Sequence, residues 1–272
     1  MADAQAADAR AADAAAAQPS ATARPSEPKP RERDIEGALG LFVADGPDYP
    51  GAEGRSTGLR PAGFIRWGRW SLSGAGGFTT KRRDNVDGGL GALVHRGQTL
   101  RFSLGLRREG GRNEYDSPTL AGLGEIPRTV QGRVSLRWTP QPQWQLRAGL
   151  AFDLSRRVGG TLFDLSLTRS WALDADSSFA VAAGLTAATE SQMQAWHGIT
   201  PEQSQRSGYP VYRAGAGLRD ARLSATWRAE LSDRWAGFAG VTATQLLGPA
   251  ARSPLTQQRG GVTLSSGLVW RF

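Results

Sequence analysis

The stretch ARLSATWRAEL, residues 221–231, sorts its side chains into two classes with a period of two. Its odd positions hold only Ala, Leu and Trp, whereas its even positions hold Arg, Ser, Thr and Glu. Successive side chains of a β-strand point to opposite faces, whereas a helix would mix the two classes around its axis. The stretch therefore predicts a strand with one apolar and one polar face.

The same alternation recurs along the chain and predicts an all-β fold. We expect a single closed antiparallel transmembrane β-barrel of about twelve strands, with ten as the alternative count. Most of these strands reach the roughly 9–11 residues that a tilted strand needs to cross a bilayer. The expected strands are 37–46, 57–67, 69–79, 86–95, 98–108, 128–139, 143–155, 159–171, 177–188, 217–231, 234–246 and 260–272.

The connectors between these strands alternate in length. Short links follow every second strand, near Gly68, 96–97, 140–142, 173–176 and 232–233. The other links are longer, up to about 28 residues between 189 and 216, with one short exception near 156–158. Short periplasmic turns alternating with longer outer loops are typical of outer-membrane barrels.

Tryptophan supplies a second indication of a membrane. Seven of the nine tryptophans fall beside the short turns or at the C-terminus. A soluble sandwich or a lipocalin-like barrel would also alternate, but it has no reason to sort its tryptophans to one set of strand ends. Because indole rings prefer the membrane interface, we expect an aromatic girdle, with Phe272 as an assembly and anchoring residue. The predicted girdle consists of Trp67, Trp70, Trp138, Trp144, Trp171, Trp235, Trp270 and Phe272.

Composition limits the other classes. The chain of 272 residues has no run of 18 apolar residues for a transmembrane helix and no Cys for a disulfide. Its net charge of +8 suits a polyanion, for which we expect lipopolysaccharide phosphate and membrane lipid, not nucleic acid. Residues 1–34 are rich in Ala and Pro and are expected to be disordered, which leaves 35–272 for the barrel. They lack the basic start and apolar core of a signal peptide, so the expected outer-membrane location rests on the barrel alone.

Three ordered segments resemble one family. The first segment, GLFVADGPDYPG at 40–51, is similar to the opening strand of that family and its Pro-x-Tyr-x-Gly turn. The second segment, GITPEQSQRSGYPVYRAGAG at 198–217, is similar to the family's Gly-Val-Thr…Ser-x-x-Ser-Gly…Tyr-x-x-Gly-x-Gly segment. LLGPAARSPL at 246–255 resembles its closing loop, although Pro249 replaces the usual Asp. The family is that of the MltA-interacting protein (MipA) and OmpV barrels. The matching loop residues are Pro47, Tyr49, Gly51, Ser204, Ser207, Gly208, Tyr212, Ser253 and Pro254.

The resemblance spans about residues 37–272 and implies a non-enzymatic outer-membrane scaffold. Such a scaffold binds a lytic murein transglycosylase and a bifunctional penicillin-binding protein, so that it links murein hydrolysis to synthesis. Some members of the family are described as adhesins or in connection with antibiotic or osmotic stress. The alternative function is a channel for small polar or anionic solutes.

Catalytic residues are scarce. Only His95 and His197 could act as a base, and Ser204 and Ser207 lie near His197 in the sequence. We expect these residues to serve loop polarity and turns. Two His without Cys cannot supply most transition-metal sites, and no glycine-rich segment has the context of a phosphate loop. We therefore expect no enzyme, no metal and no cofactor.

Arginines fall into two sets. One set lies on the polar face, which a barrel turns toward its lumen, and predicts either an anion-favouring lumen or, as we prefer, a narrow interior filled with paired charges. This set is Arg101, Arg133, Arg137, Arg222 and Arg228. The other set lies near the outer strand ends, where guanidinium groups could bind lipid A phosphates or simply be solvated. This set is Arg82, Arg83, Arg156 and Arg157.

Overall fold

The computed structural model describes residues 35–74, 78–81, 84–86 and 88–272, with no side-chain description for 78–86. The predicted disordered segment 1–34 lies outside the described residues. Twelve strands close into one antiparallel barrel in the order β1-β14-β13-β12-β11-β10-β9-β8-β7-β6-β3-β2. The predicted class and strand count are thus confirmed, and the alternative of ten strands is wrong. The strands are β1 (Ile35–Pro47), β2 (Arg55–Trp67), β3 (Trp70–Ser73), β4 (Phe78–Lys81), β5 (Asp84–Val86), β6 (Gly89–Arg96), β7 (Leu100–Glu109), β8 (Thr129–Gln141), β9 (Trp144–Asp153), β10 (Thr161–Ala172), β11 (Ser177–Ala188), β12 (Gly217–Glu230), β13 (Trp235–Leu246) and β14 (Gly260–Arg271).

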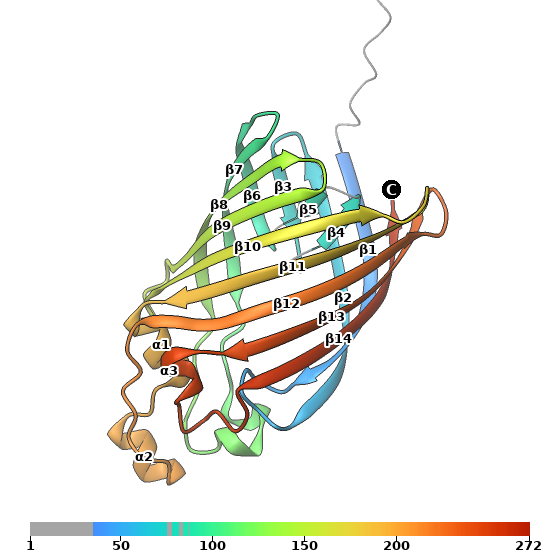
Figure 1. The fold of residues 1–272 in the computed structure, drawn as a ribbon. Coiled ribbons are helices and arrows are strands. Elements are labelled where there is room, and N and C mark those ends of the chain that lie inside the picture. The colour runs from blue at the N-terminus through green and yellow to red at the C-terminus, as the bar shows by residue number, and fades with distance from the viewer. Residues whose placement is uncertain (1–34, 75–77, 82–83, 87) are drawn as a thin grey trace, which may run out of the picture. The chain divides into compact units, whose positions relative to one another are not determined.

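The barrel closes where its first and last strands meet. β1 pairs with β14 from Ala38 opposite Arg271 to Asp45 opposite Leu264. The start of β1 and the C-terminus therefore lie at the same end (Figure 1). We call this the inner end, and the opposite end, which carries the long loops, the outer end.

The alternation of the sequence becomes two faces of the barrel wall. On β12, Leu223 and Trp227 point outward and are 57% and 43% exposed, whereas Arg228 faces inward and is 4% exposed. Exposed leucines, valines and aromatic side chains recur on the outward face of the other strands. So large an apolar surface is stable only in an apolar medium, as expected of a membrane-spanning barrel.

One expected strand is wrong. The continuous strand 69–79 ends at Ser73, and β4 and β5 form a separate two-stranded sheet within the connection to β6. Gly74 follows the last residue of β3 directly. Glycine weakens a strand because it costs more backbone entropy and offers no side chain to pack.

The interior is not uniformly polar. Inward side chains of β1, β2, β13 and β14 form an apolar cluster instead. Such side chains fill a narrow barrel by packing against one another. The cluster consists of Ala38, Ala62, Phe64 and Val269, with Phe42 and Phe238 packed against it.

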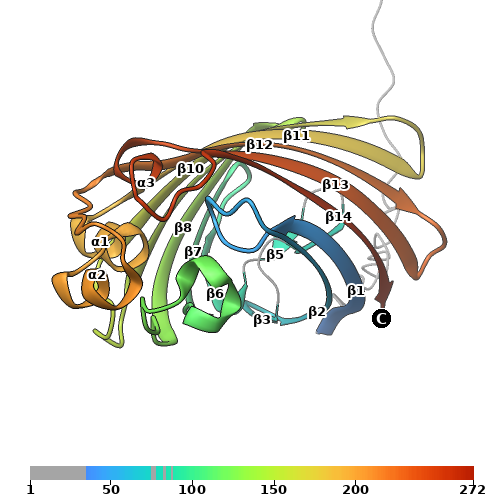
Figure 2. The same cartoon turned by 90° about the horizontal axis from the view of Figure 1, so that it is seen from below.

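Short helices occupy the outer end. They are η1 (Glu114–Asp116) and η2 (Pro118–Leu120) between β7 and β8, α1 (Glu190–His197) and α2 (Pro201–Ser207) between β11 and β12, and α3 (Gly248–Ala251) between β13 and β14. Figure 2 shows them around the mouth of the barrel, with α1 to α3 in orange to red and the loop between β7 and β8 in green. Within the described part of the chain, no helix combines the length and apolarity needed to cross a membrane.

Candidate functional site

Four outer loops share a hydrophobic core, and we call them together the cap (48–54, 110–128, 189–216 and 247–259). Leu120, Leu123, Ile199 and Leu255 are each at most 2% exposed, and they pack into one cluster. Tyr49, Tyr209 and Tyr212 pack against this cluster. The loop after β7 and the loop after β11 begin on strands that are four places apart in the barrel order. Their contact therefore carries the cap across the mouth.

Helix α1 lies on the lumen side of the wall. Met193 is fully buried in a second cluster with Ala188 of β11 and Leu246 of β13, both of which are inward positions. Leu162, an inward residue of β10, packs against the same cluster. The helix thus packs against the inner face of the wall at the outer end.

Hydrogen bonds join the loops of the cap. An Nη atom of Arg112 donates to the carbonyl oxygen of Trp196 at 2.9 Å, and Nε2 of Gln203 donates to that of Leu123 at 2.7 Å. The hydroxyl of Tyr49 donates to the carbonyl oxygen of Leu255 at 3.0 Å. Buried carbonyl groups need such donors, because an unsatisfied polar group would destabilise the cap.

Glycine permits the closest approach within the cap. Gly122 has φ of +79°, and a Cβ atom there would lie 2.8 Å from the carbonyl oxygen of Arg206. Its amide N–H and that of Gly124 donate to Oε2 of Glu114 at 3.1 and 3.0 Å. A side chain at position 122 would separate the two loops.

All three family-like motifs contribute residues to the cap, although the sequence did not indicate that they meet. From the first motif, Tyr49 binds the third motif at Leu255, and the Gly51 carbonyl accepts from the amides of Gln257 and Gln258 at 2.8 and 3.1 Å. From the second motif, the Tyr212 hydroxyl donates to the carbonyl of Pro249 at 2.8 Å. Pro47 ends β1, Gly208 ends α2 with φ of +79°, and Pro254 follows Ser253 in the loop after α3.

The serine hydroxyls of the cap donate hydrogen bonds to its backbone carbonyl groups. Ser204 donates to the carbonyl oxygen of Tyr209 at 2.6 Å, and Ser207 donates to that of Gln203 at 2.7 Å. Ser253 donates to the carbonyl oxygen of His197 at 2.6 Å. A hydroxyl with its proton on a carbonyl is not prepared as a nucleophile.

His197 is buried in the cap. Burial, assisted by the charges of Arg219 and Arg112, lowers the pKa of His197 to about 4, while Asp220 opposes this shift. The imidazole is therefore neutral at physiological pH. Among the described residues, no three His, Cys, Asp or Glu side chains gather as a metal site would require.

A charged network lies in the lumen beneath the cap. Arg222 contacts Oδ1 of Asp164 and Oδ1 of Asp220, both at 3.3 Å, and donates to Oγ1 of Thr186 at 3.0 Å. Asp220 also pairs with Arg219 at 2.6 Å. This part of the lumen fits the interpretation of paired interior charges.

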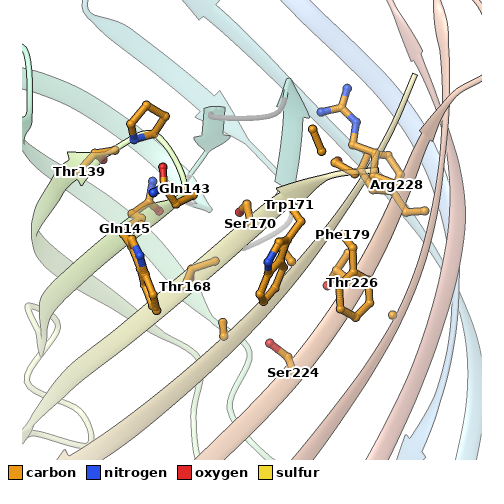
Figure 3. A pocket seen from close by; sticks show the side chains of 18 of the residues that line it. Thr139, Gln143, Gln145, Thr168, Ser170, Trp171, Phe179, Ser224, Thr226 and Arg228 are labelled. Atoms are coloured by element: carbon orange, nitrogen blue, oxygen red, sulfur yellow. The ribbon is translucent and has the colours of Figure 1, made fainter. Parts of the chain in front are cut away.

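Below this network the inner half of the lumen holds a cavity of about 790 Å³. Figure 3 shows inward hydroxyl and amide side chains, such as Thr168, Ser170 and Gln145, on adjoining strands of its wall. Turn residues Gln98 and Gln143 also line the cavity, so it reaches the inner end. Its volume lies in the range of small-molecule sites, about 300–1,000 Å³.

The expected lumen arginines lie in three places. Arg228 pairs with Glu230, which also accepts from Arg271, and its guanidinium lies 5.6 Å from the ring centre of Phe238. Arg222 belongs to the network under the cap. Arg101 and Arg137 line the cavity, and together with Arg133 and Arg147 they line a smaller neighbouring space of about 100 Å³.

The inner end carries the expected tryptophans. Arg169 lies between two of them, with its guanidinium carbon 5.1 Å from the ring centre of Trp144 and 4.9 Å from that of Trp171. The rings of Trp270 and Phe272 lie 5.3 Å apart at their centres. The other members, Trp67, Trp70, Trp138 and Trp235, are outward and exposed at strand ends near the short turns.

The arginines expected to bind lipopolysaccharide remain a prediction. Arg156 and Arg157 are exposed in the loop between β9 and β10, with φ of +55° at Arg156. Arg82 and Arg83 lie outside the described residues.

Comparison with protein families gives one match, to the family described as MltA-interacting protein MipA, over residues 39–272. The chain belongs to this family. The resemblance expected from the three motifs is therefore confirmed, and the chain is an outer-membrane barrel of the MipA family. Comparison with curated protein sequences found no match.

Similar solved structures are barrels with little sequence identity. The NanC porin is 9% identical with a TM-score of 0.46, and the match covers 85% of this chain and 100% of that chain. A bacterial polysaccharide outer membrane secretin is 10% identical with a TM-score of 0.45, and the match covers 87% and 98%. OmpT of Vibrio cholerae is 6% identical with a TM-score of 0.39, and the match covers 88% and 97%.

Proposed function

We propose that this MipA-family barrel is a non-enzymatic scaffold that binds a lytic murein transglycosylase from the inner, periplasmic end. The match to a family described as MltA-interacting over residues 39–272 carries this proposal. A penicillin-binding protein is the second proposed partner, through which murein synthesis and hydrolysis would be linked. Membrane lipid and lipopolysaccharide surround the barrel.

The geometry supports a structural role over a catalytic one. The hydroxyls of Ser204, Ser207 and Ser253 donate to backbone carbonyls. His197 is buried and neutral. The polar groups of the cap thus hold its loops together and are not arranged around a substrate.

The cap also argues against the alternative of an open channel. It crosses the outer mouth with its own apolar core, and α1 fills the lumen side at Met193. We expect no steady conductance from the protein in a planar bilayer. A persistent open pore with anion preference would favour the channel.

Binding of a purified lytic transglycosylase to the full chain in detergent micelles tests the scaffold. Exchanging charges in the inner turn, Asp233→Lys with Arg234→Glu, should weaken binding. The matched exchange in outer helix α2, Glu202→Lys with Arg206→Glu, should leave it unchanged; both pairs are exposed. A folded wild-type barrel that does not bind the enzyme would contradict the proposal.

A further inference from the structure

Arg169 points out of the barrel wall near the inner end. It is an exposed residue of β10 and lies directly opposite Trp144, the first residue of β9. Leu167 and Trp171, two positions away on either side, share its outward face and are 45% and 37% exposed. The guanidinium group therefore lies on the membrane-facing surface, at the level of the aromatic girdle.

Two indole rings hold the Arg169 side chain at this level. Its guanidinium carbon lies 5.1 Å from the ring centre of Trp144 and 4.9 Å from that of Trp171. Aromatic faces attract a cation, but they accept none of its in-plane N–H groups as a carboxylate or phosphate oxygen would. The rings thus orient the guanidinium group and leave its N–H donors for another partner.

The charge of Arg169 is not neutralised within the described part of the chain. Among these residues, no carboxylate lies within ion-pair distance of its guanidinium group. The turn that follows β10 is acidic, but Asp174 of this turn accepts from the amide and the hydroxyl of Ser177, both at 2.6 Å. A cation on a lipid-facing surface is costly, and an anion in the adjacent headgroup layer would lower that cost.

An outward groove of about 350 Å³ adjoins the two indole rings, and we call it the lipid-facing groove. It runs over three neighbouring strands, on which Trp138, Leu146 and Leu167 lie directly opposite one another. The pairing of β8 with β9 shifts in register between Trp138 and Gln141, and such a bulge bends a strand locally. The groove is lined by Trp138, Pro140, Gln141, Trp144, Leu146 and Leu167.

We propose that Arg169 and the lipid-facing groove bind an anionic glycerophospholipid of the surrounding membrane, such as phosphatidylglycerol. The guanidinium group donates to the lipid phosphate, and one acyl chain lies in the groove against Leu146 and Leu167. The amide of Gln141 is placed to bind the hydroxyl groups of the headgroup. A zwitterionic headgroup would bring an ammonium group to a cation, which disfavours it. The inference rests on the outward face and does not depend on the scaffold role.

Native mass spectrometry of the full chain in a non-ionic detergent tests the site, with phosphatidylglycerol and phosphatidylcholine of identical acyl chains as competing probes. We expect the wild type to retain phosphatidylglycerol about tenfold or more in preference, and higher salt to weaken this preference. Arg169→Gln should abolish the preference, because charged hydrogen bonds are lost. The matched control is Arg69→Gln, which removes an exposed charge 6.0 Å from a single ring, that of Trp70, and should keep the preference.

A second variant tests the groove. Leu146→Trp should fill it and reduce the retention of phosphatidylglycerol, while Arg169 stays in place. Leu150→Trp, on the same outward face of β9 but outside the groove, is the control and should retain the lipid. Unchanged retention in Leu146→Trp would refute the groove as the acyl-chain site.

Two competitors separate this lipid from other phosphates. Inorganic phosphate should not displace phosphatidylglycerol, because it has no acyl chain to bind the groove. Displacement by phosphate would show a site for free anions instead. Lipid A that is retained more tightly than phosphatidylglycerol, and released in Arg169→Gln, would overturn the proposed lipid class.

Folding of each variant is checked by heat-modifiable gel mobility. All four substitutions lie on the outward face or in a turn, so we expect the barrels to fold. Phosphatidylglycerol should also raise the unfolding temperature of the wild type more than phosphatidylcholine does. Equal retention of the two lipids by the wild type, or an equal loss of preference in Arg69→Gln and Arg169→Gln, would refute the site.

Discussion

The two ends of the barrel use their polar groups in opposite ways. At the outer end, side chains of Arg112, Gln203 and Tyr49 donate to carbonyls of other loops around an apolar core. At the inner end, hydroxyls, amides and arginines line a cavity of about 790 Å³. The same chain thus builds an outer end whose loops are hydrogen-bonded to one another around an apolar core and an inner end that holds a polar cavity.

The largest expected effect is the loss of stable packing in the cap at the outer end. Met193→Ala with Ile199→Ala removes two fully buried side chains, and each such truncation costs about 2–5 kcal/mol. We expect rapid proteolysis of residues 189–216 and faster amide exchange there, with the barrel still heat-modifiable. Val211→Ala, at a half-exposed position of the same loop, is the control. Unchanged protection of the loop in the double variant would refute the buried cap.

The next effect is a dependence of the cap on pH. The pKa of His197 is about 4 in the folded cap, below its usual value near 6.5, so the unfolded loop binds the proton more tightly. Cap stability is therefore complete above pH about 6.5, falls as the pH drops toward 4, and levels off below that. The loss is on the order of 3 kcal/mol.

Proteolysis of the cap across this pH range measures the effect. His197→Gln should abolish the dependence between pH about 6.5 and 4. The same slope in wild type and variant would show that another group titrates.

A smaller effect on cap stability is expected at the contact between the loops that carry Gly122 and Arg206. Gly122→Ala combines strain at φ of +79° with a contact 2.8 Å from the Arg206 carbonyl oxygen. We expect a loss of cap stability of about 1–3 kcal/mol, measured by amide exchange. Gly124→Ala is the matched control, since its φ is +70° but its nearest neighbour is a side-chain atom 3.5 Å away. Equal losses in both variants would assign the effect to backbone strain alone.

The smallest effect concerns the inner girdle. Arg169→Gln removes cation–π contacts to Trp144 and Trp171, each worth about 0.5–1 kcal/mol at exposed sites. We expect a slightly lower unfolding temperature and a shift in tryptophan emission. Protection of the cap should not change, because the two ends are independent.

The strands could be predicted because their signal is local. Period-two alternation needs only a few neighbouring residues, and the tryptophans mark one end directly. Helix α2 also had a signal that was missed. Thr200 caps its N-terminus, Pro201 is its first residue, Gln203 completes a capping box, and Gly208 caps its C-terminus in the left-handed region.

The two functional regions could not be predicted because they depend on distant pairing. The three loop motifs meet only once the barrel has closed. The sequence alone does not show how far apart they lie in the folded barrel. The adjacency of Arg101, Arg137 and Arg147 depends on register, since a shift of one residue would turn Arg137 away from both neighbours. The inward cluster around Phe64 and Val269 was hidden because the polar face was expected to line the lumen, whereas these inward positions hold apolar side chains.

The seam between β1 and β14 has a consequence for how the barrel is made. The Gly37 amide donates to the Phe272 carbonyl at 3.3 Å, and the Phe272 amide donates to that of Gly37 at 3.0 Å. Until this seam forms, both strands are open edges that invite pairing with another chain. The two strands of the seam are separated by almost the whole barrel sequence. The chain therefore loses conformational entropy in bringing them together before the hydrogen bonds between β1 and β14 can stabilise the closed barrel. A chain stalled before the last strand would thus be an aggregation hazard, and closure is the step at which an assembly chaperone would act with the greatest benefit.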